Sequence, residues 1–302
     1  MNSDLVATIG FFDGVHRGHK FLINNVIDCA KRSGGMQSAV ITFDRHPRLV
    51  LHKDFQPQLL TTADEKAERL KATGVDRCFI LHFDEEMASL SAYDFMKTVL
   101  RDRLNVRKLI TGYDNRFGHN RSEGFEDYVR YGHELGMEVA RAEAFTLNGV
   151  QVSSSVVRSF LSAGEIRMAS MCLGYNYTLT GKVVDGHHEG RKMGFPTANI
   201  EVNDKQKLVP EAGVYAVKAV TDGGARTYGG MMNIGTRPTF DGTDTTLEVN
   251  LFGFEGDIYG KTVSVMFIDR LRKERKFSSA AKLAEQLNAD RDAALAILER
   301  EG

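Results

Sequence analysis

Two histidines three residues apart, His16 and His19, follow an apolar run that ends in Asp13 and Gly14. The pattern predicts a buried strand over Leu5–Phe12, a tight turn and the start of a helix. Free backbone N–H groups and the helix dipole favour an anion at such a place. At i and i+3 the two imidazoles share a helix face, where they can donate hydrogen bonds to a phosphate and stabilise charge developing on it.

Spacing alone leaves two other interpretations of these histidines open. Together with Asp13 they could bind a metal ion. They could also be ordinary polar residues at the start of a helix, because a short motif is only a hypothesis.

The wider string is more specific. Residues 10–19, Gly-Phe-Phe-Asp-Gly-Val-His-Arg-Gly-His, resemble the HxGH signature of the nucleotidylyltransferase superfamily. More narrowly, they resemble the adenylyltransferase module of the bifunctional bacterial riboflavin kinase/FAD synthetases. In that superfamily the histidines contact the phosphates of ATP, and the reaction releases pyrophosphate. The resemblance implies two catalytic histidines, His16 and His19, and further ATP contacts from Gly10, Phe12 and Asp13.

A loop over residues 42–47, Thr-Phe-Asp-Arg-His-Pro, closes a predicted strand. It resembles the Thr-Phe-Asp-Pro-His-Pro segment of the same family, with Arg45 in place of the usual proline. The resemblance implies flavin contacts for Asp44 and His46. From the residues alone, the segment is simply a loop that ends a strand.

Residues 112–118, Gly-Tyr-Asp-Asn-Arg-Phe-Gly, resemble the Gly-x-Asp-Phe-x-Phe-Gly loop of the family. Asn115 stands where an aromatic residue is common, which leaves any ligand contact at that position in doubt. The resemblance implies flavin contacts for Asp114 and Phe117, although Phe117 also fits a core aromatic.

Residues 153–158, Ser-Ser-Ser-Val-Val-Arg, predict a helix start whose serines cap free N–H groups. They resemble the Ile-Ser-Ser-Thr-x-Ile-Arg motif, in which serine and arginine hold the ATP triphosphate. The resemblance implies ATP contacts for Ser154, Ser155 and Arg158, with Arg158 catalytic. The planar fork of donors on arginine suits a phosphate.

The second half carries a glycine-rich stretch followed by Gly-Phe-Pro-Thr-Ala-Asn at residues 194–199. Glycine-rich loops let the backbone approach phosphates, but in a β domain they are usually only turns. The hexapeptide resembles the hallmark of riboflavin kinases, where the threonine and asparagine hold Mg²⁺ and phosphate oxygens, here Thr197 and Asn199. Hard Mg²⁺ prefers such oxygen ligands. The ATP contacts that the resemblance implies are Gly181, Val183, Gly190, Arg191, Gly194, Phe195, Pro196, Thr197 and Asn199.

Residues 233–240 and 247–251 extend the resemblance. Glu248 falls between apolar residues on a predicted strand, so it is either a solvent-facing residue or a functional base. The family implies that it is the catalytic base for the ribityl hydroxyl. The flavin contacts implied in this half are Asn233, Arg237, Glu248 and Arg272, although Arg272 also fits a solvated charge.

Strand-like and helix-like segments alternate over residues 1–174. A capping box at Thr62 and Glu65 opens one helix, which stops near Gly74, and Ser91 caps another. Alternation predicts a Rossmann-like parallel sheet with helices on both faces, whose ligands bind beyond the carboxyl ends of the strands. The predicted strands are Leu5–Phe12, Ser38–Phe43, Arg77–Phe83, Lys108–Gly112 and Met137–Glu143.

Residues 175–302 are rich in strands separated by Gly, Asp and Asn turns, which predicts a small antiparallel β-barrel. A terminal helix is expected over about Ser279–Glu299. We therefore expect an FMN adenylyltransferase domain over residues 1–174 and a riboflavin kinase domain over residues 175–302. The predicted strands are Tyr177–Val184, Gly213–Val220, Thr227–Ile234, Thr246–Phe252 and Thr262–Arg270.

The composition limits the classes of binding partner that we expect. The formal net charge of −1 over 302 residues gives no general attraction to nucleic acid or an anionic membrane. Three scattered cysteines, no apolar run of membrane-spanning length and no leader pattern favour the cytoplasm. We expect small-molecule partners (riboflavin, FMN and ATP), no nucleic acid or membrane partner, and a monomer or weak homo-oligomer.

The expected chemistry is phosphorylation of riboflavin to FMN, then adenylylation of FMN to FAD with release of pyrophosphate, using ATP and Mg²⁺. Three alternatives stay open. They are another cytidylyl- or adenylyltransferase with a β appendage, a flavin-binding sensor or kinase-only enzyme with a decayed adenylyltransferase module, and a metal-binding module.

Overall fold

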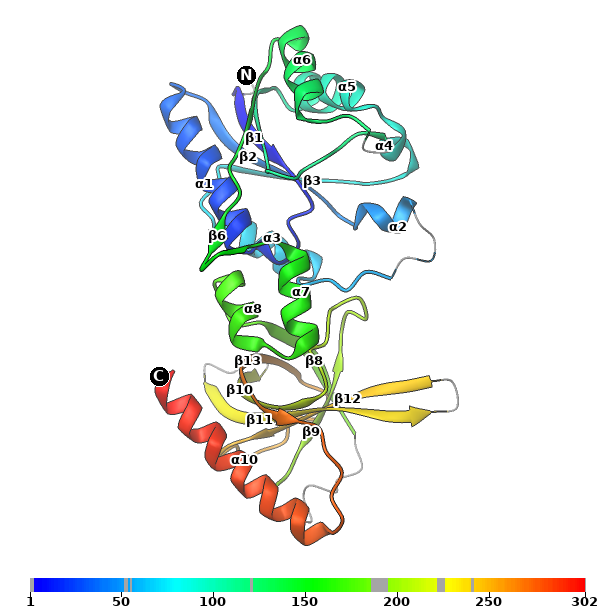
Figure 1. Ribbon diagram of the computed structural model, residues 1–302, viewed down its shortest axis with the longest axis vertical. Coiled ribbons are helices and arrows are strands. Elements are labelled where there is room, and N and C mark those ends of the chain that lie inside the picture. Colours follow the sequence, from blue (N-terminus) through cyan, green and yellow to red (C-terminus); the bar gives the residue numbers. More distant parts are fainter. Residues whose placement is uncertain are drawn as a thin grey trace. The chain divides into compact units, whose positions relative to one another are not determined.

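The computed structural model describes residues 3–51, 54, 56–119, 122–185, 195–221, 226–239 and 242–301. The chain divides into two compact units, Met1–Ser154 and Ser155–Gly302 (Figure 1).

The first unit is built on a five-stranded parallel sheet with the strand order β3-β2-β1-β4-β5. This confirms the predicted Rossmann-like sheet. Because all the strands run in one direction, their carboxyl ends share one edge. The strands are β1 (Leu5–Ile9), β2 (Gln37–Phe43), β3 (Arg77–Leu81), β4 (Val106–Thr111) and β5 (Glu138–Arg141).

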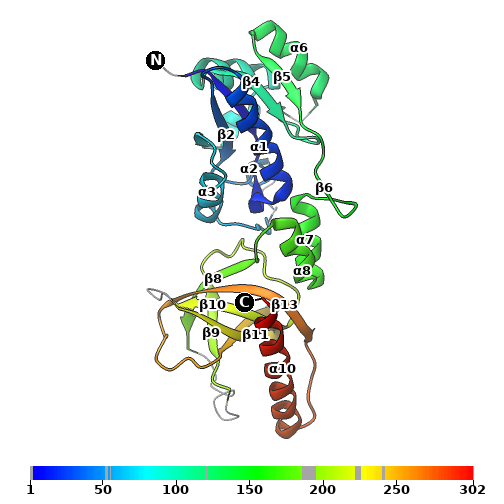
Figure 2. The same cartoon turned by 90° about the vertical axis from the view of Figure 1, so that its left-hand side faces the viewer.

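Helices cover both faces of this sheet (Figure 2). Alternation along β1 sends Ala7 and Ile9 into one core and Val6 into the other. The first core includes Met96 and Leu100, and the second includes Ile23 and Val26 of the helix that follows β1. The helices are η1 (Asp13–Val15), α1 (Arg17–Arg32), α2 (Pro47–Leu51), α3 (Ala63–Lys71), α4 (Glu85–Ser89), α5 (Ala92–Asp94), the π-helix η2 (Phe95–Arg103) and α6 (Phe125–Leu135).

The predicted helix starts at Thr62 and Ser91 are confirmed. Thr62 and Glu65 form a reciprocal capping box ahead of α3, and the Ser91 side chain accepts a hydrogen bond from the backbone N–H of Asp94. A two-stranded hairpin, β6 (Thr146–Leu147) with β7 (Val150–Gln151), was not predicted, because each strand is too short to show a pattern.

Strand β1 is shorter than predicted and ends at Ile9 rather than at Phe12. The backbone N–H of Gly10 still donates to the carbonyl of Ile41, but Phe12 adopts a left-handed conformation with φ of 56°. The apolar character of Phe11 and Phe12 therefore serves packing around the turn rather than strand pairing.

The second unit is a closed antiparallel barrel with the strand order β10-β11-β12-β9-β8-β13, as predicted. One of its strands, β9, was not predicted, because its five residues follow directly on the Gly-Phe-Pro-Thr motif and resemble a loop. The strands are β8 (Thr178–Val184), β9 (Ala198–Val202), β10 (Gly213–Thr221), β11 (Thr227–Thr239), β12 (Gly242–Leu251) and β13 (Thr262–Lys273).

Strands β11 and β12 are longer than predicted, because their pairing continues to Thr239 opposite Gly242. The corresponding predicted strands ended at Ile234 and began at Thr246. Threonines in the added stretch favour a strand, although the apolar alternation has ended there.

Within the described residues, the second unit contains the helices α7 (Ser154–Ala163, whose first residue belongs to the first unit), α8 (Ile166–Leu173) and α10 (Ala280–Arg300). The guanidinium of Arg270 on β13 donates to the carbonyl oxygens of Ala163 and Ala212, which ties the end of α7 to the barrel. The two units are distinguished by the contacts within each of them and not by function. The predicted boundary between two functional domains near residue 174 therefore stays a prediction.

The terminal helix α10 packs along the barrel (Figures 1 and 2). Its Ala294 is fully buried in a cluster with Phe195, Ala216 and Met231. Ser279, the predicted first residue of this helix, is its N-cap, and the helix begins at Ala280. No helix in the described part of the chain is long and apolar enough to cross a membrane.

Candidate active sites

The turn after β1 is held in place by a buried carboxylate. Asp13 is only 3% exposed and accepts hydrogen bonds from the backbone N–H groups of Leu60 and Thr61, at 2.9 and 3.1 Å. The N–H of Gly14 donates in turn to Thr61 Oγ1. Asp13 therefore shapes the turn, and its contact with ATP stays a prediction.

Replacing Asp13 with asparagine should destabilise the first unit by about 2 kcal/mol. The amide NH2 would replace Oδ2, which accepts from the buried N–H of Leu60, and the charge that strengthens the two bonds to Oδ1 would be lost. Urea unfolding followed by circular dichroism measures the change. The matched variant Asp28→Asn, at an exposed position of α1, should shift the unfolding free energy by less than about 0.5 kcal/mol. Equal shifts for the two variants would contradict the role given to Asp13.

The two histidines lie together at the start of α1. His16 is the N-cap, and its Nδ1 accepts a hydrogen bond from the backbone N–H of His19 at 3.2 Å. The two rings stack with centroids 3.6 Å apart, and the ring of Phe12 meets that of His19 edge-on at 5.0 Å. Because Nδ1 of His16 accepts this bond, the ring can carry its proton on Nε2.

Gly18, between the histidines, has a steric reason to be glycine. A Cβ at this position would lie 2.9 Å from the carbonyl oxygen of Val152 and 3.2 Å from the His16 ring. The HxGH turn therefore packs directly on the segment that leads into α7. Ser154, the first residue of α7, donates from Oγ to the carbonyl oxygen of Asp13 at 2.9 Å.

That bond brings Ser154 to the turn that carries the histidines, and its contact with ATP stays a prediction. Ser155 is exposed, and Arg158 follows Ser154 by one turn of α7. Arg158 belongs to the second unit, so its predicted action beside His16 and His19 stays a prediction.

The predicted flavin-side residues Asp44 and His46 follow β2 at the same edge of the sheet. His82 Nδ1 lies 2.6 Å from the carboxylate of Asp44, and the N–H of Phe83 donates to it. Burial alone raises the pKa of Asp44, but these two hydrogen bonds, with the charges of His82 and Arg45, lower it overall. The ring of His46 packs edge-on against Phe11, with centroids 4.7 Å apart.

The loop over residues 112–118 is built by two contacts that the sequence did not reveal. The side-chain amide of Asn115 donates to the carbonyl of Ile9, which ties the loop to the end of β1. The Phe117 ring stacks on Tyr128 at 4.2 Å and packs against the core. This packing matches the core interpretation of Phe117, and its flavin contact stays a prediction, as does that of the exposed Asp114.

Lys66 on α3 is a buried charge that was not predicted from the sequence. It is 3% exposed, and its Nζ donates to the carbonyl of Phe43 at 2.7 Å. Burial lowers the pKa of Lys66 to about 8, against the opposing effects of Asp13, Cys78 and Asp44. The sequence contains one indication of this burial. Lys66 lies four residues before the apolar Leu70, so the two side chains share the core-facing side of the helix.

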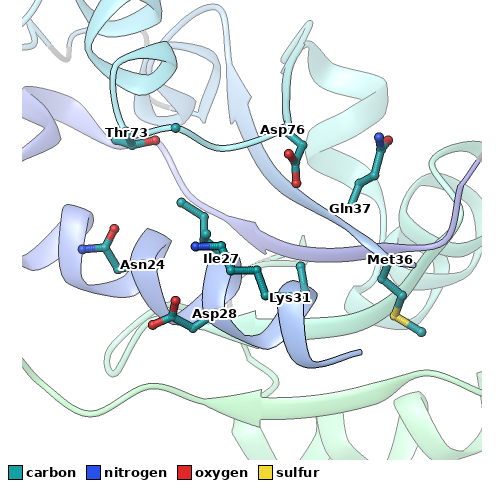
Figure 3. Close-up of a pocket in the computed structure, with 10 residues that line it drawn as sticks. Asn24, Ile27, Asp28, Lys31, Met36, Gln37, Thr73 and Asp76 are labelled. Carbon is teal, nitrogen blue, oxygen red and sulfur yellow. The ribbon is translucent and has the colours of Figure 1, made fainter. Parts of the chain in front are cut away.

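A hollow of about 650 Å³ lies away from all these residues (Figure 3). Gln37, at the amino end of β2, and Thr73 and Asp76, ahead of β3, line it with Asp28 and Lys31 of α1. It is therefore at the amino ends of the strands, opposite the edge where parallel sheets bind ligands, and it contains no predicted site residue.

In the barrel, three predicted site residues form one row across neighbouring strands. Glu248 on β12 lies opposite Asn233 on β11 and opposite Asn199 on β9. Residues directly opposite each other project from the same face of a sheet. The adjoining row, Met232 with Val249 and Ala198, is buried on the other face.

Thr197 completes this row, because its Oγ1 donates to Glu248 Oε2 at 3.4 Å. Its backbone is held from one side by Asn250, whose buried side-chain amide donates to the carbonyl of Pro196 at 2.6 Å. Phe195 is anchored beneath α10. The hydroxyl, carboxamide and carboxylate oxygens that meet here are the ligand types that Mg²⁺ prefers.

The remaining kinase residues are placed in part. Gly181 and Val183 are buried on β8, and a Cβ at Gly181 would clash with the carbonyl oxygen of Glu201. Arg272 makes a bidentate ion pair with the buried Asp290 of α10, at 2.8 to 3.0 Å. This ion pair fastens α10 to β13, and the flavin contact of Arg272 stays a prediction.

Some predicted ligand contacts fall on residues outside the described parts of the chain. Gly190, Arg191 and Gly194 lie outside the described residues, as does the side chain of Arg237 on β11. Within the described residues, no three side chains of His, Cys, Asp or Glu are grouped so as to hold a metal ion. The metal-binding interpretation of Asp13 with the two histidines therefore gains no support.

A parallel-sheet unit with an HxGH turn and a closed barrel with a Thr-Asn-Glu row define a two-part transferase that uses nucleotides. Family models match both parts: FAD synthetase over residues 1–156 and riboflavin kinase over residues 173–298. The chain belongs to the bifunctional riboflavin kinase/FMN adenylyltransferase family.

Relatives that bear the name bifunctional riboflavin kinase/FMN adenylyltransferase match nearly the whole chain. The protein from Pseudomonas fluorescens is 38% identical over 97% of this chain and 92% of its own length. The protein from Escherichia coli K12 is 36% identical over 94% and 90%. A crystal structure described as a macrolide-efflux protein from Streptococcus pneumoniae is 32% identical, with a TM-score of 0.88 over 97% of this chain and 94% of that one.

Proposed function

We propose that this chain phosphorylates riboflavin to FMN and adenylylates FMN to FAD, with ATP as the co-substrate in both reactions. The observation that carries the kinase half is the contact of Glu248 with Thr197, in a row with Asn199 and Asn233. The stacked pair His16 and His19 at the carboxyl end of β1 supports the second half.

In the kinase reaction, Glu248 accepts the proton of the ribityl hydroxyl as its oxygen attacks the γ-phosphorus of ATP, and ADP leaves. Thr197 and Asn199 supply oxygen ligands for Mg²⁺. When bound, the ion neutralises charge on the phosphates. Asn250 holds the Pro196 carbonyl and so sets the position of the Thr197 hydroxyl.

In the adenylyltransferase reaction, a phosphate oxygen of FMN attacks the α-phosphorus of ATP. The bond to the β-phosphate oxygen breaks, and pyrophosphate leaves. No covalent enzyme intermediate is needed, so positioning and charge stabilisation are the contributions of the protein. His16 donates from Nε2 and His19 from its ring to the oxygens where charge accumulates, and Arg158 adds a fixed positive charge.

Incubation of the purified chain with riboflavin, ATP and Mg²⁺, followed by chromatography of the flavins, tests the proposal. We expect FMN to appear first and FAD to follow. Accumulation of FMN without FAD would support a kinase-only enzyme with a decayed first unit. Binding of flavin without turnover would support a sensor.

The three cysteines are free thiols. A cytoplasmic location agrees with this chemistry and with the small-molecule substrates, and we propose it together with a monomer or weak homo-oligomer.

A further inference from the structure

Helix α3 is attached to the histidine-bearing turn through the residues that precede it. Thr61 accepts from Gly14 N–H, and both Leu60 and Thr61 donate backbone hydrogen bonds to Asp13. The capping box of Thr62 and Glu65 then starts the helix immediately. The first turns of α3 are therefore fixed relative to the turn after β1.

Lys66 projects from this part of α3 and contacts two segments at once. Its Nζ donates to the carbonyl oxygen of Phe43, the last residue of β2, at 2.7 Å. The same nitrogen lies 3.9 Å from the centre of the Phe11 ring, within the range of a cation–π interaction. One ammonium group therefore joins the segment that follows β1 to the end of β2.

Both segments lead directly to predicted ligand-binding residues. Phe11 precedes the turn that carries His16, and its ring packs on His46. Phe43 precedes Asp44, whose carboxylate is held by His82. A small displacement of either segment would move groups that must meet ATP and FMN within a fraction of an ångström.

We propose that Lys66 is a positioning residue of the adenylyltransferase site, which holds the turn after β1 and the loop after β2 in one arrangement. This inference rests on the proposed function, and Lys66 itself is too buried to touch a substrate.

The protonation state of the Lys66 ammonium group gives the proposal a measurable pH dependence. Burial lowers the pKa of Lys66 to about 8, although Asp13 of η1, Cys78 of β3 and Asp44 after β2 act to raise it. Below pH 8 the group is charged and keeps its attraction for the Phe11 ring. Above pH 8 it becomes neutral, and that attraction is lost. The FMN adenylyltransferase activity should therefore fall as the pH rises through about 8.

The experiment compares the full-length wild type with Lys66→Met, Lys66→Arg and the control Lys71→Met, an exposed lysine on the same helix. FAD formation from FMN and ATP is measured as kcat and KM between pH 6.5 and 9.5. Riboflavin phosphorylation by the same preparations is the internal reference, because its site is on the barrel. Far-UV circular dichroism and a melting curve check folding.

We expect Lys66→Met to lose about tenfold in kcat/KM for FAD formation and to lack the fall above pH 8. Riboflavin phosphorylation should stay within twofold of the wild type. Lys66→Arg should recover part of the rate and should also lack the fall, because a guanidinium keeps its proton. Lys71→Met should match the wild type in both respects.

A folded Lys66→Met variant with the wild-type rate and pH profile would overturn the proposal. An equal loss in both reactions would also overturn it. If Lys66→Met does not fold, the pH profiles of the wild type test the proposal. A wild type whose rate of FAD formation does not fall above pH 8, or whose two reactions fall alike, would contradict it. A wild type that forms FMN but no FAD would instead refute the proposed adenylyltransferase, and with it the role of Lys66.

Discussion

Replacing Glu248 with glutamine should lower the rate of riboflavin phosphorylation by about a thousandfold, while FAD still forms from added FMN. Glutamine keeps the size of the side chain and can still accept the hydrogen bond from Thr197, but it cannot take up a proton. The loss should appear mainly in kcat, because a general base acts in the transition state.

The matched control is Glu201→Gln, an exposed carboxylate on the neighbouring strand β9. This substitution also removes one negative charge, close to the row of Asn199, Glu248 and Asn233 but from a residue that is not part of that row. We expect its kinase rate to stay within twofold of the wild type. A Glu248→Gln variant that kept more than a tenth of the wild-type kcat would show that Glu248 is not the base.

The His19→Ala variant should form FAD at least a hundredfold more slowly than the wild type, and FMN should accumulate when the variant is supplied with riboflavin. The imidazole that would stabilise the departing pyrophosphate is then absent. His19 is a cleaner test than His16, because the His16 ring also caps α1 through the His19 N–H. Its removal would weaken the helix as well as the site.

The control for this variant is His133→Ala, at an exposed histidine in the last turn of α6. Rates of FAD formation from FMN and of FMN formation from riboflavin are measured on the same preparations. If His19→Ala slowed both reactions equally in a folded protein, the assignment of the two reactions to separate units would be wrong.

Local patterns predicted most of the elements that position the sites. Alternation of strands and helices indicated the parallel sheet, and short strands between turn residues indicated the barrel. The capping residues Thr62 and Ser91 marked helix starts, because a cap depends on only a few adjacent residues. Strand ends were less accurate, because apolar residues such as Phe12 pack around a turn as readily as in a strand.

The grouping of Thr197, Asn199, Asn233 and Glu248 was expected only from a resemblance. No local pattern relates residues about 50 positions apart. The register of β9, β12 and β11 places three of them in one row, and the strand β9 itself was not predicted.

By itself, the sequence determined the fold class, the order of the two parts and the residue types available for phosphate and flavin chemistry. These follow from periodicity and from motifs within about ten residues. Only the tertiary structure decided what Asp13, Asn115 and Lys66 do, because each acts on a backbone group brought close by folding: Leu60 and Thr61, Ile9, and Phe43, respectively. A buried polar group must find a partner, and that partner is chosen by packing rather than by neighbourhood in the chain.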